Sequence, residues 1–268
     1  MPVMLAVVIW LVCAAITAPF VMKTWWFPVA ISEHARTVDS QIMLTFWVTG
    51  VVFILAHLAL GWAVFKYGQK RSGPATYSHG NNTLELVWTS AAAILFIGLV
   101  LMGTSVWARV HMSAAPAGSM PVEVTGKQFA WSMRYPGPDG KLGALDIRQI
   151  NDANGNPLGI DSKDPAGKDD ITFPNLVVPV NRSIEVTLRS LDVTHSFFVP
   201  ELRLKQDAVP GMTIRINFIA DKVGLYELPC AELCGLGHFK MRAFLDVKEQ
   251  GEFDKWMQER VAERAAQQ

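Results

Sequence analysis

The sequence predicts a membrane-anchored protein in which N-terminal helices precede an all-β domain. Half of the 268 residues are hydrophobic, and they are concentrated in roughly the first 110 positions, whereas the rest has the composition of a soluble domain. In this second part, short alternating runs are separated by turn residues, a pattern typical of β-strands. The formal net charge is zero, so nothing in the charge balance points to nucleic acid as a partner.

Three apolar runs account for the predicted helical anchor, which we place at residues 1–110. Each run is about 20 residues long, the length that a helix needs to cross the core of a bilayer. Backbone polar groups in lipid must pair within their own segment, so we expect three transmembrane helices. The runs contain no Asp, Glu, Lys or Arg and cover residues 3–22, 43–65 and 86–107.

The first run fits either a retained helix or a cleaved signal peptide. No basic residue precedes it, and the apolar core of a signal peptide is usually shorter, so we favour a helix. In the loop after the second run, Lys66, Lys70 and Arg71 occur, and no acidic residue comes before Glu85. The positive-inside rule therefore places this loop in the cytoplasm and the C-terminal domain on the outer side.

The C-terminal part is predicted to be a β-sandwich or barrel over residues 121–249. Residues 111–120 are small and turn-prone and suit a linker. Residues 136–170 are rich in Gly, Pro, Asn and Asp, which indicates an inserted surface loop, and residues 250–268 are expected to form a C-terminal helix and tail. Alternating runs predict strands at Pro121–Thr125, Ile171–Val178, Ser183–Leu188, His195–Val199, Thr213–Ala220 and Ala243–Val247.

The twelve residues from Cys230 to Met241 indicate a copper site. They include a second thiol at Cys234 and an imidazole at His238. Thiolate, imidazole and thioether are soft or borderline ligands, which favour copper over magnesium or calcium. Zinc accepts Cys and His but gains little from a Met thioether.

The second cysteine distinguishes this pattern from a mononuclear blue-copper site, which uses one Cys. Two thiolates can bridge two copper ions, and each ion then needs one imidazole and one weak axial donor. The loop supplies a single histidine, so the other must come from elsewhere, and His195 in Asp-Val-Thr-His-Ser-Phe-Phe is the best candidate. The backbone carbonyl of Glu232 suits the remaining axial position. The predicted ligand set is His195, Cys230, Glu232, Cys234, His238 and Met241.

Two simpler interpretations of this segment are open. Cys230 and Cys234 can form a disulfide in an oxidising compartment, although this leaves His238 and Met241 unexplained. Met241 can also be ordinary core packing at the start of a strand.

The sequence resembles subunit II of cytochrome c oxidases from about residue 40 to residue 257. The family pattern C-x-E-x-C-G-x-x-H-x-x-M is matched at every specified position from Cys230 to Met241, D-V-x-H-S-F is matched by Asp192–Phe197, and V-P-x-L-x-x-K-x-D-x-x-P-G by Val199–Gly211. The resemblance implies a cupredoxin-like Greek-key barrel preceded by two membrane helices, so the third predicted helix is an extra one.

The resemblance also implies an electron-transfer subunit of a haem–copper terminal oxidase in the bacterial inner membrane. Such a subunit accepts electrons from a c-type cytochrome at a binuclear copper centre, CuA, on the periplasmic side. It passes them to haem in subunit I, where dioxygen is reduced to water and protons are translocated, so no catalytic residue is expected in this chain. The implied partners are subunit I, the other oxidase subunits, the cytochrome and the lipid bilayer.

Two glutamates acquire expected roles from the resemblance. Glu232 corresponds to the family glutamate whose carbonyl meets copper and whose carboxylate meets a magnesium ion at the interface with subunit I. Glu85 resembles the glutamate near the mouth of a proton pathway into subunit I, but an acidic residue is also favourable at a helix N-terminus for electrostatic reasons alone.

One aromatic stretch departs from the family. The pattern G-x-Q-W-x-W appears as Gly126–Trp131, with Phe129 where the family usually has the tryptophan that receives the electron. Phe129 and Trp131 are the candidates for this step. With the extra helix and the insertion, the departure suggests an unusual donor, such as a membrane-tethered cytochrome or a supercomplex partner.

Three other functions fit parts of the sequence. A quinol oxidase subunit II has the same architecture but lacks the copper ligands. A CuA subunit of a nitric oxide reductase differs only in its partner. A membrane-tethered copper chaperone or scaffold needs an exchangeable site with few, exposed ligands, unlike the enclosed set predicted here.

Overall fold

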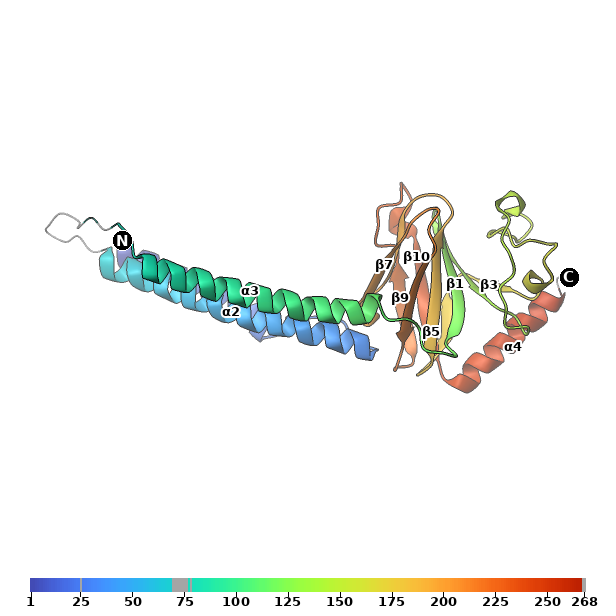
Figure 1. Cartoon of the computed structure of the whole chain (residues 1–268), viewed down its shortest axis with the longest axis horizontal. Helices are drawn as coiled ribbons and strands as arrows, with labels where there is room; N and C mark the ends of the chain where they lie inside the picture. Colours follow the sequence, from blue (N-terminus) through green and yellow to red (C-terminus); the bar gives the residue numbers. More distant parts are fainter. Residues whose placement is uncertain (25, 69–76, 78, 267–268) are drawn as a thin grey trace. The chain divides into compact units, whose positions relative to one another are not determined.

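The chain folds into two compact units, one helical and one holding the β-strands (Figure 1). The first unit comprises Met1–Pro28 and Val38–Trp107, and the second Val29–Thr37 and Ala108–Gln268. The computed structural model describes all residues except 25, 69–76, 78, 267 and 268. Lys70 and Arg71, which contributed to the predicted cytoplasmic loop, lie outside the described residues.

The three predicted membrane helices are present. In the described part of the chain, three helices are long and apolar enough to cross a membrane. Two of them extend beyond the charge-free runs, because polar residues at the ends also adopt the helical conformation. At the start of α3, the side chain of Asn81 caps the helix, since its Oδ1 accepts from the Leu84 N–H at 3.0 Å. The helices are α1 (Pro2–Val21), α2 (Glu33–Tyr67) and α3 (Asn82–His111).

Helix α1 packs closely against α2. Gly61 on α2 lies where any added Cβ would collide with the Trp10 indole, and Gly68 lies similarly against Pro2. On α1, Ala6 is fully buried and the Cys13 side chain is almost fully buried. Small residues allow close approach of helices in membranes, so the first apolar run forms a packed helix pair in this structure.

The strands of the β unit form three sheets. The sheet orders are β3-β2-β1-β5-β8, β4-β10-β9 and β6-β7, so the described strands do not form one closed Greek-key barrel. The bounds are β1 (Met120–Lys127), β2 (Ala130–Tyr135), β3 (Ile171–Phe173), β4 (Leu176–Pro179), β5 (Ser183–Ser190), β6 (His195–Val199), β7 (Leu204–Ala208), β8 (Ile214–Ile219), β9 (Gly224–Pro229) and β10 (Arg242–Lys248).

Three strands were not expected from the sequence, namely β2, β7 and β9. The run predicted as one strand at Ile171–Val178 is instead two strands, β3 and β4, in different sheets. Pro174, which has no backbone N–H, interrupts the run. Beyond it, the Tyr135 hydroxyl accepts from the Val177 N–H at 2.7 Å and fixes the chain in its new sheet.

The core of the β unit lies around β1 and β5, which pair in parallel. Along β5, Ile184, Val186 and Leu188 are fully buried and alternate with half-buried polar residues, as expected for a strand with one face in the core. β1, the central strand of the sheet, is buried almost continuously from Val122 to Gly126.

A buried ion cluster attaches the insertion to the first sheet. Arg134 on β2 is only 1% exposed; its guanidinium lies 2.5 Å from Asp170 and 3.1 Å from Glu123, and it also donates to the Gly143 carbonyl. Asp170 in turn accepts from the Gly143 N–H at 3.0 Å. Because Gly143 and Asp170 belong to the two ends of the insertion, one arginine fixes both ends to the sheet.

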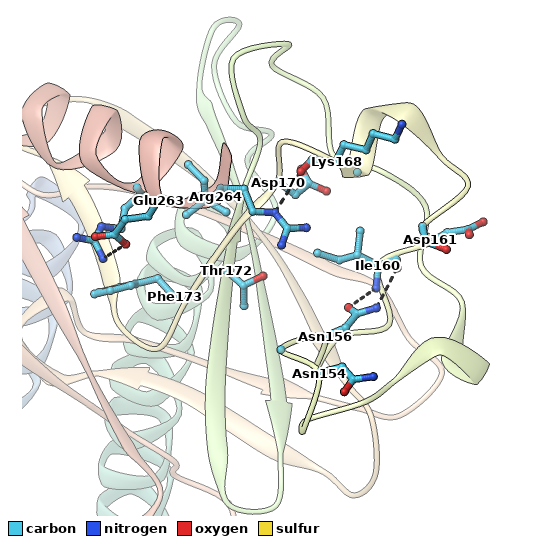
Figure 2. Close-up of a pocket in the computed structure, with 15 residues that line it drawn as sticks. Asn154, Asn156, Ile160, Asp161, Lys168, Asp170, Thr172, Phe173, Glu263 and Arg264 are labelled. Carbon is cyan, nitrogen blue, oxygen red and sulfur yellow. Dashed lines mark hydrogen bonds and ion pairs between the residues drawn. The ribbon is translucent and has the colours of Figure 1, made fainter. Parts of the chain in front are cut away.

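The C-terminal helix α4 (Gln250–Ala266) covers the same side of the unit. Trp256 makes edge-to-face contacts with Tyr135 and Phe173, at centroid distances of 5.3 and 5.5 Å. A pocket of about 620 Å³ lies between α4 and the insertion (Figure 2), where Arg264 Nε donates to the Lys168 carbonyl at 3.1 Å. Asn156 is bonded to the backbone of Ile160 and stabilises the loop from within. The insertion therefore has a defined fold.

Candidate metal centre

The cysteine loop connects β9 to β10. Its two ends are joined, because the Cys230 N–H donates to the Met241 carbonyl at 2.9 Å. The loop is also tied to β6, where the Ser196 carbonyl accepts from the Ala231 N–H at 3.0 Å. These backbone bonds make the loop a closed unit that lies against the first residues of β6.

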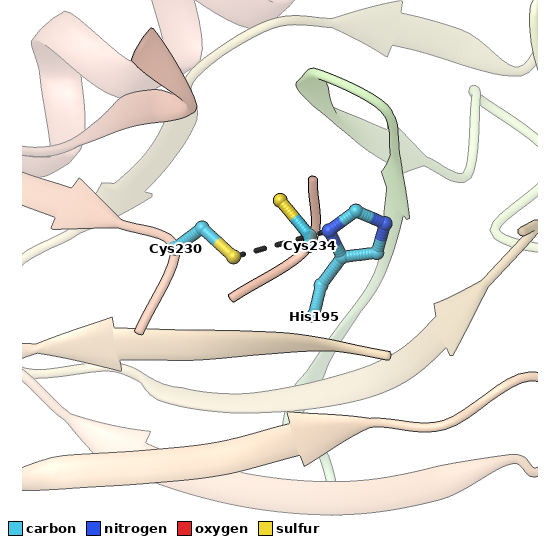
Figure 3. Close-up of side chains that lie close together, drawn as sticks. All are labelled: His195, Cys230 and Cys234. Atoms are coloured by element: carbon cyan, nitrogen blue, oxygen red, sulfur yellow. Dashed lines mark hydrogen bonds between the residues drawn. The ribbon is translucent and has the colours of Figure 1, made fainter. Parts of the chain in front are cut away.

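His195 is the first residue of β6 and is fully buried. Its ring points at the cysteine loop (Figure 3), with Nδ1 3.8 Å from the Cys230 Sγ. Gly126 on β1 leaves room for this ring, since a Cβ there would lie 2.8 Å from the His195 Cδ2. The ligand atoms of His195, Cys230 and Cys234 all lie within 4.8 Å of one another.

The remaining predicted donors surround the same two sulfur atoms. The Cys234 Sγ lies 3.6 Å from the His238 Nδ1 and 3.7 Å from the Met241 Sδ. The Cys230 Sγ lies 3.2 Å from the Glu232 carbonyl oxygen. The fold thus brings all six predicted donors together from β6 and one loop.

The surroundings of the two thiols differ. Burial raises the pKa of the Cys230 thiol, but the neighbouring His195 ring and backbone groups of Glu232 and Ser196 outweigh this and bring the pKa to about 6. Burial and the adjacent Cys230 both raise the pKa of Cys234, to about 11. The pair therefore loses its protons in two steps, as expected for two acids that share one site.

His195 is held from its other side by a carboxylate. Its Nε2 lies 2.8 Å from the Asp192 Oδ1, which fixes the ring orientation and leaves Nδ1 facing the sulfur atoms. Sequence reasoning did not assign a role to Asp192, although the residue lies within the D-V-x-H pattern that was noted. A histidine whose second nitrogen is held in this way is the usual arrangement in metal sites.

The two aromatic candidates contact different parts of this cluster. Trp131 is buried, and its ring meets His195 edge-to-face at 5.9 Å and Phe197 at 6.5 Å. Phe129 is 38% exposed, and its ring covers Gly235 and Gly237 of the cysteine loop. Phe129 is therefore a partly exposed aromatic residue on the cysteine loop, and Trp131 is part of the core beside His195.

Comparison with known proteins identifies the family. The family model for the periplasmic domain of cytochrome c oxidase subunit II matches residues 120–247. An alternative cytochrome c oxidase subunit 2 from Bradyrhizobium diazoefficiens is 36% identical over 237 residues, which cover 88% of this chain and 83% of the relative. This chain belongs to the cytochrome c oxidase subunit II family.

Two further relatives are similar. The cytochrome c oxidase subunit 2 of Cereibacter sphaeroides is 28% identical over 241 residues, covering 87% of this chain and 77% of the relative. The crystal structure of the periplasmic domain of subunit II of cytochrome oxidase from Bradyrhizobium japonicum is 32% identical, with a TM-score of 0.42, and covers 56% of this chain and 99% of that domain.

Membership of the cytochrome c oxidase subunit II family confirms several predictions. The chain is a subunit of a haem–copper oxidase and works with other oxidase subunits in a bacterial membrane. The predicted fold class, apolar helices followed by a cupredoxin-like β domain, is also confirmed, although the strands form separate sheets.

The family implies a copper centre, and the donor set of this subunit II chain fits one. Two thiols, two imidazoles, a thioether and a carbonyl are gathered around the Cys230 and Cys234 sulfur atoms. These are the soft and borderline ligands that copper prefers. Both sulfur atoms and the His195 ring are buried, as expected for an enclosed centre in this subunit II.

Glu85 lies in the first turn of α3, in the helical unit. The side chain of Asn81 caps this helix, so Glu85 is not its N-cap residue. Glu232 is exposed, while its backbone carbonyl faces the Cys230 sulfur. Both residues are exposed, and the first turn of α3 is equally the position where the helix dipole alone favours an acidic residue such as Glu85.

Proposed function

We propose that this chain receives electrons from a c-type cytochrome at a binuclear CuA centre and passes them to haem in subunit I, for reduction of dioxygen coupled to proton translocation. The supporting observation is the pairing of donors: each of two adjacent thiol sulfur atoms has its own imidazole and its own weak donor. The proposed ligands are His195, Cys230, Glu232 through its carbonyl, Cys234, His238 and Met241.

The residues of the chain provide a rigid frame for this centre. Copper held by two thiolates supplies a redox site whose geometry changes little between its oxidation states. The backbone bonds of Cys230 and Ala231 hold the loop closed, and Asp192 holds the His195 ring. Ligands fixed in this way cannot rearrange when an electron arrives, which keeps the barrier to transfer low.

The buried donors also bear on the alternative functions. A chaperone site must release its metal to a partner, but His195 is fully buried and Cys234 is only 3% exposed. Release from such a site requires opening of the loop. A quinol oxidase subunit II has no use for this complete donor set, so the electron-receiving role is the better explanation.

We expect the donor to dock mainly through apolar contacts. Leu233, Leu236 and Phe239 of the cysteine loop are 78%, 97% and 79% exposed, and the Phe129 ring lies against Gly235 and Gly237 of the same loop. Exposed apolar residues grouped in this way mark interaction sites. Transfer from the donor is then expected to depend weakly on salt, because screening acts on charged contacts. Fast transfer from a soluble cytochrome that falls steeply with salt would contradict this donor assignment.

The remaining roles extend the same proposal. The exposed Glu232 carboxylate is available to a magnesium ion at the interface with subunit I, and Glu85 on α3 to a proton pathway. The basic Lys66 at the end of α2 supports a cytoplasmic loop there and a periplasmic β unit. Removal of magnesium from the complex should then change the rate of electron transfer in the wild type but not in the Glu232→Gln variant.

The copper content of the intact chain in detergent tests the proposed function. We expect about two copper ions per chain and a paramagnetic signal from one electron shared by two copper nuclei. Cys234→Ser should remove the shared signal, because one bridging thiolate is lost. Cys13→Ser, which removes the thiol of α1, is the matched control and should retain it. One copper ion per wild-type chain, or an unchanged signal in Cys234→Ser, would falsify the assignment.

A further inference from the structure

The two-residue turn between β1 and β2 contacts the cysteine loop directly. In this turn, the Gln128 side-chain amide donates to the Cys234 backbone carbonyl at 2.5 Å. The same nitrogen lies 2.7 Å from the position that a Cβ on Gly235 would occupy. A polar side chain outside the proposed ligand set therefore binds the backbone of a proposed ligand and fills the space beside the next residue.

Gln128 is also connected to His195. Its backbone N–H donates to the Asp192 Oδ2 at 2.7 Å, and the other oxygen of this carboxylate lies 2.8 Å from the His195 Nε2. The side chain of Gln128 thus reaches the cysteine loop while its backbone reaches the carboxylate behind the histidine. One residue links the two segments that provide the proposed ligands.

The bonded carbonyl belongs to the peptide that joins Cys234 to a glycine. Gly235 has φ +132°, a backbone conformation that residues with a side chain rarely adopt. Glycine has no Cβ to restrict rotation, so the peptide between Cys234 and Gly235 has little local resistance to turning over. The bond from Gln128 fixes the orientation of this peptide, and with it the direction of the Cys234 side chain.

We propose that Gln128 is a positioning residue that holds Cys234 and His195 in the arrangement needed for the metal centre before metal is bound. It fixes the Cys234 carbonyl through its amide and the histidine through Asp192. This inference rests on the proposed function, because it treats Cys234 and His195 as ligands. Gln128 thus determines the geometry of the site although it contacts neither metal nor substrate.

The test uses the full-length chain in detergent with Gln128→Met, which keeps the side-chain length but has no donor. In the reduced, metal-free chain, we expect Cys234 to be alkylated by iodoacetamide about fivefold faster than in the wild type, because one hydrogen bond that limits loop opening is lost. After loading with copper, we expect about fivefold faster release to a chelator and a shifted absorption spectrum.

Gln149→Met is the matched control. The Gln149 amide donates at 2.7 Å to Asp161, and its oxygen accepts from the N–H and the hydroxyl of Ser162, so the variant removes these bonds within the insertion and leaves the cysteine loop untouched. We expect this variant to retain the wild-type alkylation rate and spectrum. If Gln128→Met does not fold, Gln128→Glu replaces it, because it keeps the length and the backbone bond and loses the amide donor at neutral pH; the same changes are expected.

The outcomes separate this inference from the proposed function. Equal alkylation rates and identical spectra in the Gln128 and Gln149 variants would overturn the positioning role even if both bind copper. Failure of the wild type to bind copper would overturn the proposed function, whereas faster alkylation of Cys234 in the metal-free Gln128 variant would still support the link between the turn and the loop. A Gln128 variant with faster alkylation and a shifted spectrum supports both.

Discussion

Removal of Arg134 should strongly destabilise the β unit. The guanidinium is 1% exposed and forms ion pairs with two carboxylates, Asp170 at 2.5 Å and Glu123 at 3.1 Å. Arg134→Met keeps much of the apolar volume but leaves both carboxylates buried without this cation. Removing one partner of a buried ion pair costs about 3–5 kcal/mol. For a unit of this size, each kcal/mol lowers the Tm by about 2–4 °C, so we expect a decrease of roughly 6–20 °C.

The measurement is thermal unfolding of the full-length chain in detergent, followed by near-ultraviolet circular dichroism. Arg148→Met is the matched control, because Arg148 pairs with Asp146 at 2.9 Å on the surface and is 86% exposed, so its loss should leave the Tm nearly unchanged. A second variant, Arg134→Met with Asp170→Leu, removes the cation and one of its two carboxylates, while Glu123 keeps its ion pair with Arg189 at 2.9 Å, and should recover part of the lost stability. A Tm for Arg134→Met equal to that of Arg148→Met would refute the reasoning.

Three further predictions concern the metal site, the helix pair and the core. Asp192→Ala releases the His195 ring and should weaken copper binding by about 10–100-fold in a chelator competition, and unchanged affinity would argue against the orienting role. Gly61→Leu places a side chain in the α1–α2 contact, so Cys13 should react with a membrane-permeant maleimide that labels the wild type slowly; equal labelling would contradict the packing. Phe253→Ala empties a site that is 4% exposed and should lower the free energy of unfolding by about 3–5 kcal/mol, measured by chemical denaturation, whereas a loss below about 1 kcal/mol would show that α4 does not depend on it.

Local features of the sequence determined the helical anchor and most of the proposed ligand set. A charge-free run of about 20 residues has one stable structure in lipid, since its backbone must satisfy its own hydrogen bonds. The donors from Cys230 to Met241 lie in one short loop, so their spacing alone brings them together. The more distant His195 was proposed because the loop supplies one imidazole and His195 lies between two strand-like runs, and the structure places its ring beside the Cys230 sulfur.

Only the tertiary structure decided how the strands are paired and what holds the ligands. Alternation shows that one face of a strand is buried but not which strand lies beside it, so β3 and β4 appeared as one run although they belong to different sheets. The bonds from Gln128 to Asp192 and to Cys234 join residues 64 and 106 positions apart, so no spacing within one segment predicts them. Chain propensity acts over a few neighbouring residues, whereas these bonds exist only after the sheets have packed.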